Sequence, residues 1–144
     1  MKSLCLPATL DALEAIGNFV MEVATEAGLD IKAAYNLRLA VDEIATNIIT
    51  HGYEEAGLTG DVNASSMLSD TALTIVLKDT GIPFDPLNHK LPDEDELALP
   101  LEERGVGGLG ILLVLKGVDK FNYEYQDGRN HNIFVMNRPC SLPA

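Results

Sequence analysis

The sequence contains no tryptophan, only two cysteines and only 10 lysine and arginine residues among 144. Cys5 and Cys140 lie near opposite ends of the chain, so they form neither a disulfide framework nor a CxxC metal-binding pair. A reduced, cytoplasmic setting is the expectation from this cysteine usage. The chain also lacks an apolar run of the roughly 20 residues that a membrane helix needs. Its N-terminus has no apolar stretch typical of a secretion signal.

Basic residues are few relative to the 22 aspartates and glutamates, and the formal net charge is −12. A surface of this charge repels the phosphates of nucleic acids, which argues against direct binding of DNA or RNA. The acidity fits solubility or a basic protein partner. Any site for an anionic ligand such as ATP must therefore supply local hydrogen-bond donors or a metal ion. The length suits a single domain, residues 1–144, around one core.

Apolar residues recur at three- and four-residue spacing in two stretches, which predicts helices over about 10–27 and 31–51. A short third helix is expected over 111–116, after a glycine cluster. The residues expected to cap or stop the first two helices are Thr9, Asp30, Gly28 and Gly52.

Strands are predicted in the remaining apolar and β-branched stretches. They cover about 2–8, 61–68, 71–78, 118–125 and 133–137, with turns at 69–70 and 127–128. Residues 86–104 form a long loop that is rich in proline and acidic residues, and a loop of this length is usually functional. The order of the elements predicts an α+β fold. We expect a two-layer α/β sandwich, with helices on one face of a mixed, mostly antiparallel sheet.

Three polar residues lie four apart on the second predicted helix, so Glu43, Asn47 and His51 share one stripe beside the core. Such a stripe can line a cleft. There Glu43 is a candidate general base, and the carboxamide oxygen of Asn47 is a candidate ligand for Mg²⁺, which prefers oxygen donors. The alternative is the ordinary solvated face of an amphipathic helix.

The strong strand at 71–78 ends in Asp79, followed by Gly81 two residues later. A carboxylate can accept a hydrogen bond from an exocyclic amine such as that of adenine. Glycine at position 81 would let the backbone approach a flat ring closely. The alternative is an ordinary turn at a strand end.

A glycine cluster opens the short third helix. Its residues are Gly105, Val106, Gly107, Gly108, Leu109 and Gly110, preceded by Arg104. The literal GxGxxG match would suggest a nicotinamide dinucleotide site, but that motif must follow a strand, and here it follows the long loop. Glycines and free N–H groups at a helix start still suit phosphate binding. The alternatives are a helix cap without a ligand and, for Arg104, a solvated surface position.

Together the three motifs have the order and spacing of the N box, G1 box and G2 box, and the chain resembles the GHKL ATP-binding superfamily. This superfamily includes histidine kinases and gyrase-type ATPases. The stretches 40–55, 79–86 and 107–111 resemble its anti-sigma-factor serine/threonine kinase branch. The resemblance covers nearly the whole chain. It implies the Bergerat-type α/β sandwich, in agreement with the predicted order of elements.

The resemblance also implies roles for the motif residues. Glu43 would activate a hydroxyl of a protein substrate, Asn47 would coordinate Mg²⁺, and Asp79 with Gly81 would hold adenine. Segment 86–104 would be the ATP lid, and the ATP-binding residues would also include His51 and residues 104–110. The implied partners are a sigma factor and a STAS-type anti-sigma-factor antagonist, and related proteins are often homodimers.

Two positions depart from the superfamily pattern. Pro83 stands where many members carry a second glycine, and 128–130 reads Gly-Arg-Asn where many relatives have Gly-Thr. The sequence therefore leaves one alternative open beside the kinase, a catalytically inactive switch that binds its partner under nucleotide control.

Overall fold

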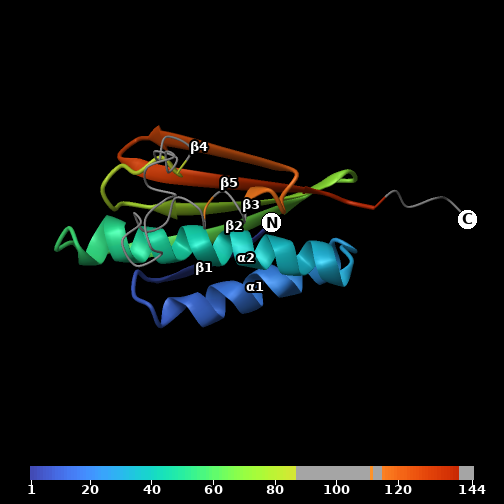
Figure 1. The fold of residues 1–144 in the computed structure, drawn as a ribbon, viewed down its shortest axis with the longest axis horizontal. Coiled ribbons are helices and arrows are strands. Elements are labelled where there is room, and N and C mark those ends of the chain that lie inside the picture. The colour runs from blue at the N-terminus through green and yellow to red at the C-terminus, as the bar shows by residue number, and fades with distance from the viewer. Residues whose placement is uncertain (87–110, 112–114, 140–144) are drawn as a thin grey trace, which may run out of the picture.

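The computed structural model describes residues 1–86, 111 and 115–139. Helices α1 (Ala12–Glu26) and α2 (Ile31–Asn47) lie side by side on one face of a five-stranded sheet (Figure 1). The strands are β1 (Lys2–Pro7), β2 (Asp61–Leu68), β3 (Ala72–Asp79), β4 (Lys120–Gln126) and β5 (Arg129–Asn137). This arrangement confirms the predicted α+β two-layer sandwich. In the described ranges, no helix is long and apolar enough to cross a membrane.

The sheet has the order β1-β2-β3-β5-β4, and all four pairings of these described strands are antiparallel. The central strand β3 pairs with β2 on one side and with β5 on the other. This second pairing joins segments far apart in the sequence and sets Asp79 directly opposite Asn130. The last strand begins at Arg129, earlier than the predicted 133, because it pairs with β4 from the Asp127-Gly128 turn onward.

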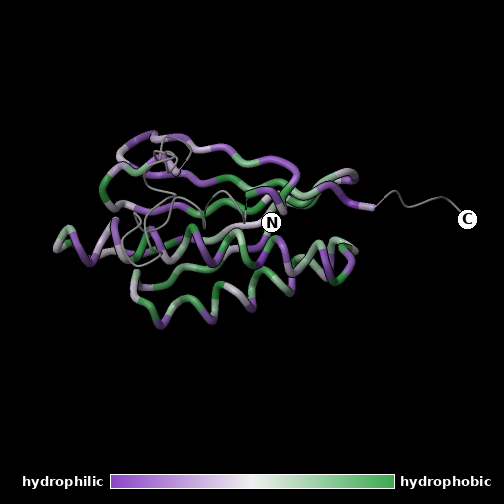
Figure 2. The backbone as a smooth tube through the Cα atoms, in the orientation of Figure 1, coloured by the Kyte–Doolittle hydropathy of each residue, from purple (hydrophilic) through white to green (hydrophobic). Residues whose placement is uncertain are grey.

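The core lies between α2 and the inner face of the sheet. Every second residue of β3 is buried, and so is every second residue of β5. Figure 2 shows the apolar and polar segments along the strands and the two helices. The apolar members of these two rows and of the helix stripe are Leu73, Ile75, Leu77, Phe134, Met136, Leu37, Val41 and Ile44. Full burial of one such side chain stabilises the fold by roughly 1.5–3 kcal/mol. At one end both strand rows change to polar residues, and the candidate site lies there.

The helix starts follow two different patterns. The Asp30 carboxylate accepts a hydrogen bond from the Ala33 N–H at 2.7 Å, so the predicted cap of α2 is confirmed. For α1 the prediction of Thr9 is wrong. Its backbone carbonyl accepts from the Ala12 N–H at 2.9 Å, and this turn delays the helix, whose N-cap is Asp11. Gly28 follows α1 with a φ of +78°, which a glycine adopts without strain.

The predicted end of the second helix at Gly52 is also wrong. After Asn47 the chain continues without a break as a π-helix, η1 (Ile48–Glu54). Its wider turn bonds each N–H to the carbonyl five residues earlier, as from Glu55 to Thr50 at 2.9 Å. The residue that follows Asn47 on the same side is therefore five positions later, not four.

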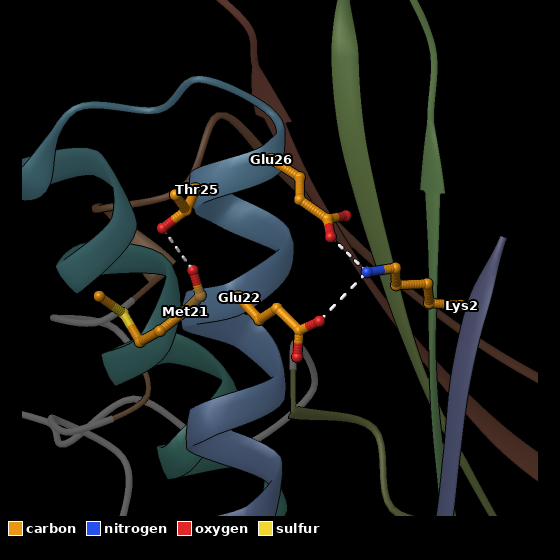
Figure 3. Close-up of polar contacts among 5 residues, drawn as sticks. All are labelled: Lys2, Met21, Glu22, Thr25 and Glu26. Atoms are coloured by element: carbon orange, nitrogen blue, oxygen red, sulfur yellow. Dashed lines mark hydrogen bonds and ion pairs between the residues drawn. The ribbon is translucent and has the colours of Figure 1, made fainter.

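An exposed ionic contact joins strand β1 to α1, far from the polar end of the sheet. Lys2 lies between Glu22, at 3.1 Å, and Glu26 on successive turns of the helix (Figure 3). Its hydrogen bonds with Glu26 and Glu22 raise the pKa of the Lys2 ammonium above the usual value. Because solvent screens exposed ion pairs, this contact adds little to the stability of the fold, and we assign it no functional role.

Candidate functional site

A small pocket lies where the polar end of the sheet meets α2 and η1. Its described lining residues are Ile44, Asn47, Ile48, Gly52, Asp79, Ile82, Phe84, Pro86, Asn130 and Asn132. The enclosed space is about 10 Å³, which is room for about one water molecule. Three elements therefore converge on one point: the helix supplies Asn47, the end of β3 supplies Asp79, and β5 supplies the two other asparagines.

Asp79 is the acidic residue among the described lining residues of the pocket. Only 3% of it is exposed. Its Oδ1 atom accepts from the Gly81 N–H and from the Asn130 amide, each at 2.9 Å. Its Oδ2 atom is buried and has no hydrogen-bond partner among the described residues. One oxygen thus fixes the orientation of the carboxylate, and the other is left to meet a ligand.

Burial raises the pKa of the Asp79 carboxyl above its ordinary value of 3.8. Three interactions oppose this increase by stabilising the charged form: the hydrogen bond from Asn130, the bond from the Gly81 N–H, and the charge of His131. A buried acceptor that carries charge has a strong preference for a donor group, because an unpaired carboxylate oxygen in an apolar site is costly.

Asn130 connects Asp79 to the chain that follows it. Besides the carboxylate, its amide nitrogen donates to the carbonyls of Gly81 at 3.2 Å and Ile82 at 3.1 Å. Its Oδ1 atom accepts from the Phe84 N–H at 3.2 Å and from the Tyr123 hydroxyl. One side chain from β5 therefore holds the turn after β3 against the sheet.

The other side of that turn is held by the π-helix. The Tyr53 hydroxyl accepts from the Thr80 N–H at 2.7 Å and donates to the Asp61 carbonyl at 3.1 Å. Gly81 packs so closely that a Cβ atom there would lie 2.7 Å from the Gly52 carbonyl oxygen. Gly81 thus packs closely against the backbone of Gly52 and is not among the described lining residues. Its expected place beneath the adenine ring stays a prediction.

The predicted polar stripe of the second helix is divided by the change to π-helix. Asn47 is 8% exposed and lines the pocket, and its Nδ2 atom has no partner among the described residues. Glu43 lies one turn earlier in α2 and is half-buried. His51 does not line the pocket, because the wider helical turn places Gly52 there instead.

His51 contacts the pocket only through a neighbour. Its Nδ1 atom lies 2.6 Å from a carboxylate oxygen of Glu55, and its ring stacks on Phe84 with 6.2 Å between the ring centres. Phe84 is a lining residue. His51 therefore lies behind Phe84 in this structure, and its role as a nucleotide contact stays a prediction.

The remaining predicted residues lie outside the described residues. These are Arg104, Gly105, Val106, Gly107, Gly108, Leu109 and Gly110, with all of the predicted lid segment 86–104 except Pro86. None of the described lining residues is basic.

Sequence reasoning missed three residues of the site. Asn130 and Asn132 lie in the polar stretch 129–132 that precedes the apolar residues of β5, so no local pattern marked them as core-facing. Tyr53 gave no signal either, because its partner Thr80 is 27 residues away in sequence.

Known proteins share both this sequence pattern and this fold. The family model described as the histidine kinase-like ATPase domain matches residues 6–136. The serine-protein kinases RsbW of Bacillus thuringiensis (strain Al Hakam) and Bacillus anthracis (strain CDC 684 / NRRL 3495) are each 26% identical over 125 residues. Each alignment covers 85% of this chain and 76% of the relative.

Among solved structures, the histidine kinase domain of the blue-light activated histidine kinase from Erythrobacter litoralis EL346 is similar in fold. The TM-score is 0.53 at 16% identity, over 86% of this chain and 58% of that one. This chain thus spans less than two thirds of the histidine kinase structure. The family match over most of the sequence, together with this fold, shows that the chain belongs to the histidine kinase-like ATPase domain family.

Proposed function

We propose that this protein binds ATP with Mg²⁺ and phosphorylates serine or threonine in a partner protein, acting as an anti-sigma-factor kinase. One observation carries the proposal. The buried Oδ2 atom of Asp79 has no partner among the described residues and lies in the pocket that Asn47 also lines. A carboxylate oxygen in this position is suited to accept a hydrogen bond from the amine of adenine.

The described residues fit the two ligands in different ways. Asp79, held by Asn130, supplies the acceptor for the base. The Asn47 carboxamide supplies one hard oxygen for Mg²⁺, which binds proteins through few side chains and keeps several waters. When bound, the metal would neutralise charge on the triphosphate, and none of the described lining residues is basic. The space of about 10 Å³ is smaller than a purine, so we propose that lining residues move when the base binds.

Glu43 is the proposed general base. It lies on the same helix as Asn47, one turn before it, and it is half-buried at the edge of the core. A carboxylate there would accept the proton of the attacking hydroxyl, while positioning and charge neutralisation supply most of the catalysis. The partners proposed here, a sigma factor and a STAS-type antagonist, rest on the likeness to the RsbW serine-protein kinases.

Calorimetric titration with ATP and Mg²⁺ tests the binding step. We expect the native protein to bind and Asp79→Asn to bind much more weakly, since the substitution replaces the unpaired acceptor by an amide. Asp70→Asn, at an exposed turn position, is the matched control and should bind like the native protein. No binding by the native protein would remove the proposal altogether.

Phosphate transfer to a candidate antagonist tests the chemistry. Glu43→Ala should bind ATP normally and transfer phosphate at least about 100-fold more slowly, the usual contribution of a general base. Glu14→Ala, on the exposed face of α1, should transfer at the native rate. A partner that binds only in the presence of ATP and is never phosphorylated by the native protein would indicate the nucleotide-gated switch instead.

A further inference from the structure

Three buried polar atoms of the described residues lack a hydrogen-bond partner, and all three belong to residues that line the same pocket. They are Nδ2 of Asn47, Oδ2 of Asp79 and Oδ1 of Asn132. Folded proteins pair nearly all such atoms, so a group of them at one point marks a place where a ligand or water completes the bonding. Asn47 and Asp79 already have proposed roles, whereas Asn132 has none.

Asn132 is an unusual residue for its position. It is 1% exposed and lies on the core-facing side of β5, in the row that continues with Phe134 and Met136. An apolar residue would fill this position without a desolvation cost. Unlike Asn130, its side chain makes no hydrogen bond with the described residues, so it does not hold the fold together through polar contacts.

The strand register brings Asn132 near Asp79. Asn130 is directly opposite Asp79, and Asn132 is directly opposite Leu77, so Asn132 and Asp79 are diagonal neighbours on one face of the sheet. Diagonal neighbours have Cα atoms about 7–8 Å apart, and their side chains can reach toward a common group. Both unpaired atoms, Oδ2 of Asp79 and Oδ1 of Asn132, are acceptors.

Two acceptors that border one small space favour a group with two donor hydrogens. The exocyclic amine of adenine has two N–H donors on one nitrogen. A purine with an oxo group at the same position would place a third acceptor oxygen against the two protein acceptors. A purine without a substituent there would leave both protein acceptors without a hydrogen bond. Discrimination of this kind is strong because the wrong base leaves buried polar atoms without partners.

We propose that Asn132 reads the base in the nucleotide site, its Oδ1 accepting one N–H of the exocyclic amine while Oδ2 of Asp79 accepts the other. The pocket then selects 6-aminopurine nucleotides by two acceptors from two neighbouring strands. This inference rests on the proposed function, since it concerns the same site.

The test compares two ligands on two proteins. ATP and purine riboside triphosphate, which lacks the amine, are titrated against the native protein and Asn132→Leu, a substitution of similar size. We expect Asn132→Leu to weaken ATP binding about three- to ten-fold, the usual effect of one lost hydrogen bond. Binding of purine riboside triphosphate should change less than two-fold, because this ligand has no amine for Asn132 to accept from. Asn122→Leu, at an exposed position of β4, should change neither affinity.

Folding is measured alongside binding. Asn132→Leu should unfold at the native temperature or above it, because it removes an unpaired acceptor from the core. Asn132→Val, which suits a strand, replaces it if the leucine variant does not fold.

The native protein gives a readout independent of any variant. N6-methyl-ATP has lost one of the two amine hydrogens, so it should bind more weakly than ATP.

The outcomes separate this inference from the proposed function. If the native protein does not bind ATP, both fall. If the native protein binds ATP and Asp79→Asn does not, but Asn132→Leu weakens both ligands equally or neither, only the role of Asn132 is overturned. Equal affinity of the native protein for ATP and N6-methyl-ATP would overturn it as well.

Discussion

The amide of Asn130 donates to Oδ1 of Asp79 at 2.9 Å, joining residues 51 positions apart in the sequence. The antiparallel pairing of β3 with β5 sets the two residues opposite each other, and no shorter-range interaction would do so. The bond turns the carboxylate so that one oxygen is satisfied and the other is available in the pocket.

Replacing Asn130 should destabilise the fold strongly. The side chain makes five hydrogen bonds around the turn after β3, and Asn130→Ala would leave several buried partners unpaired. We expect a loss of about 2–4 kcal/mol in the free energy of unfolding, measured by urea denaturation. Asn122→Ala, at an exposed position of the neighbouring strand, should stay within about 0.5 kcal/mol of the native protein. A loss no larger than that of the control would contradict the assigned network.

The Tyr53 hydroxyl should be needed for a stable turn at Thr80. In Tyr53→Phe the ring still fills its place, but the Thr80 N–H loses its acceptor at 2.7 Å. We expect a loss of about 1–3 kcal/mol in the free energy of unfolding and weaker ATP binding, since this turn follows Asp79 directly. The matched control is Tyr125→Phe, where the residue is 48% exposed. Native stability in the Tyr53 variant would show that water replaces the hydroxyl.

Substitution of Gly81 should destabilise the fold, whereas the same substitution of its neighbour Gly52 should not. A Cβ atom at position 81 would lie 2.7 Å from the Gly52 carbonyl oxygen, whereas a Cβ atom at 52 would meet its nearest neighbour at 3.9 Å. Gly81→Ala must therefore push η1 away from the turn, and we expect it to cost about 1–3 kcal/mol. Gly52→Ala should be neutral or slightly stabilising, because alanine favours a helix. Thermal unfolding of both variants measures the difference, and equal melting temperatures would count against the packing described.

The stability of the ligand-free protein should depend on pH through Asp79. Burial raises the pKa of this carboxyl in the folded state above its ordinary value of 3.8. The folded state therefore holds this proton at a pH where the unfolded state has released it. The contribution of Asp79 to stability is greatest below the unfolded pKa and is lost as the pH rises through the folded pKa.

Asp79→Asn removes this titration. Its free energy of unfolding should exceed that of the native protein at neutral pH, and the difference should shrink as the pH falls toward the unfolded pKa. Denaturation at a series of pH values, with Asp70→Asn as the exposed control, measures it. A variant less stable than the native protein at neutral pH would mean that the hydrogen bonds to the charged carboxylate outweigh its burial.

Local sequence determined much of this protein. Helical periodicity located both helices, Asp30 marked the start of α2, and β-branched residues marked β3, because these signals act over a few residues. The spacing of Glu43, Asn47, Asp79 and Gly81 identified the family to which the whole chain belongs. The predictions for these side chains as ATP or Mg²⁺ ligands remain for the experiments above.

The tertiary structure decided what local patterns do not encode. Because a π-helix follows Asn47, Gly52 and not His51 lines the pocket. The four-residue spacing of polar residues in the sequence does not predict such a change of helical period. Asn130, Asn132 and Tyr53 acquired their positions only when β5 and η1 packed against β3. Asn130 bonds Asp79 across 51 positions, Tyr53 bonds Thr80 across 27, and the strand register sets Asn132 diagonal to Asp79. Only the strand register and helix packing bring these polar atoms together.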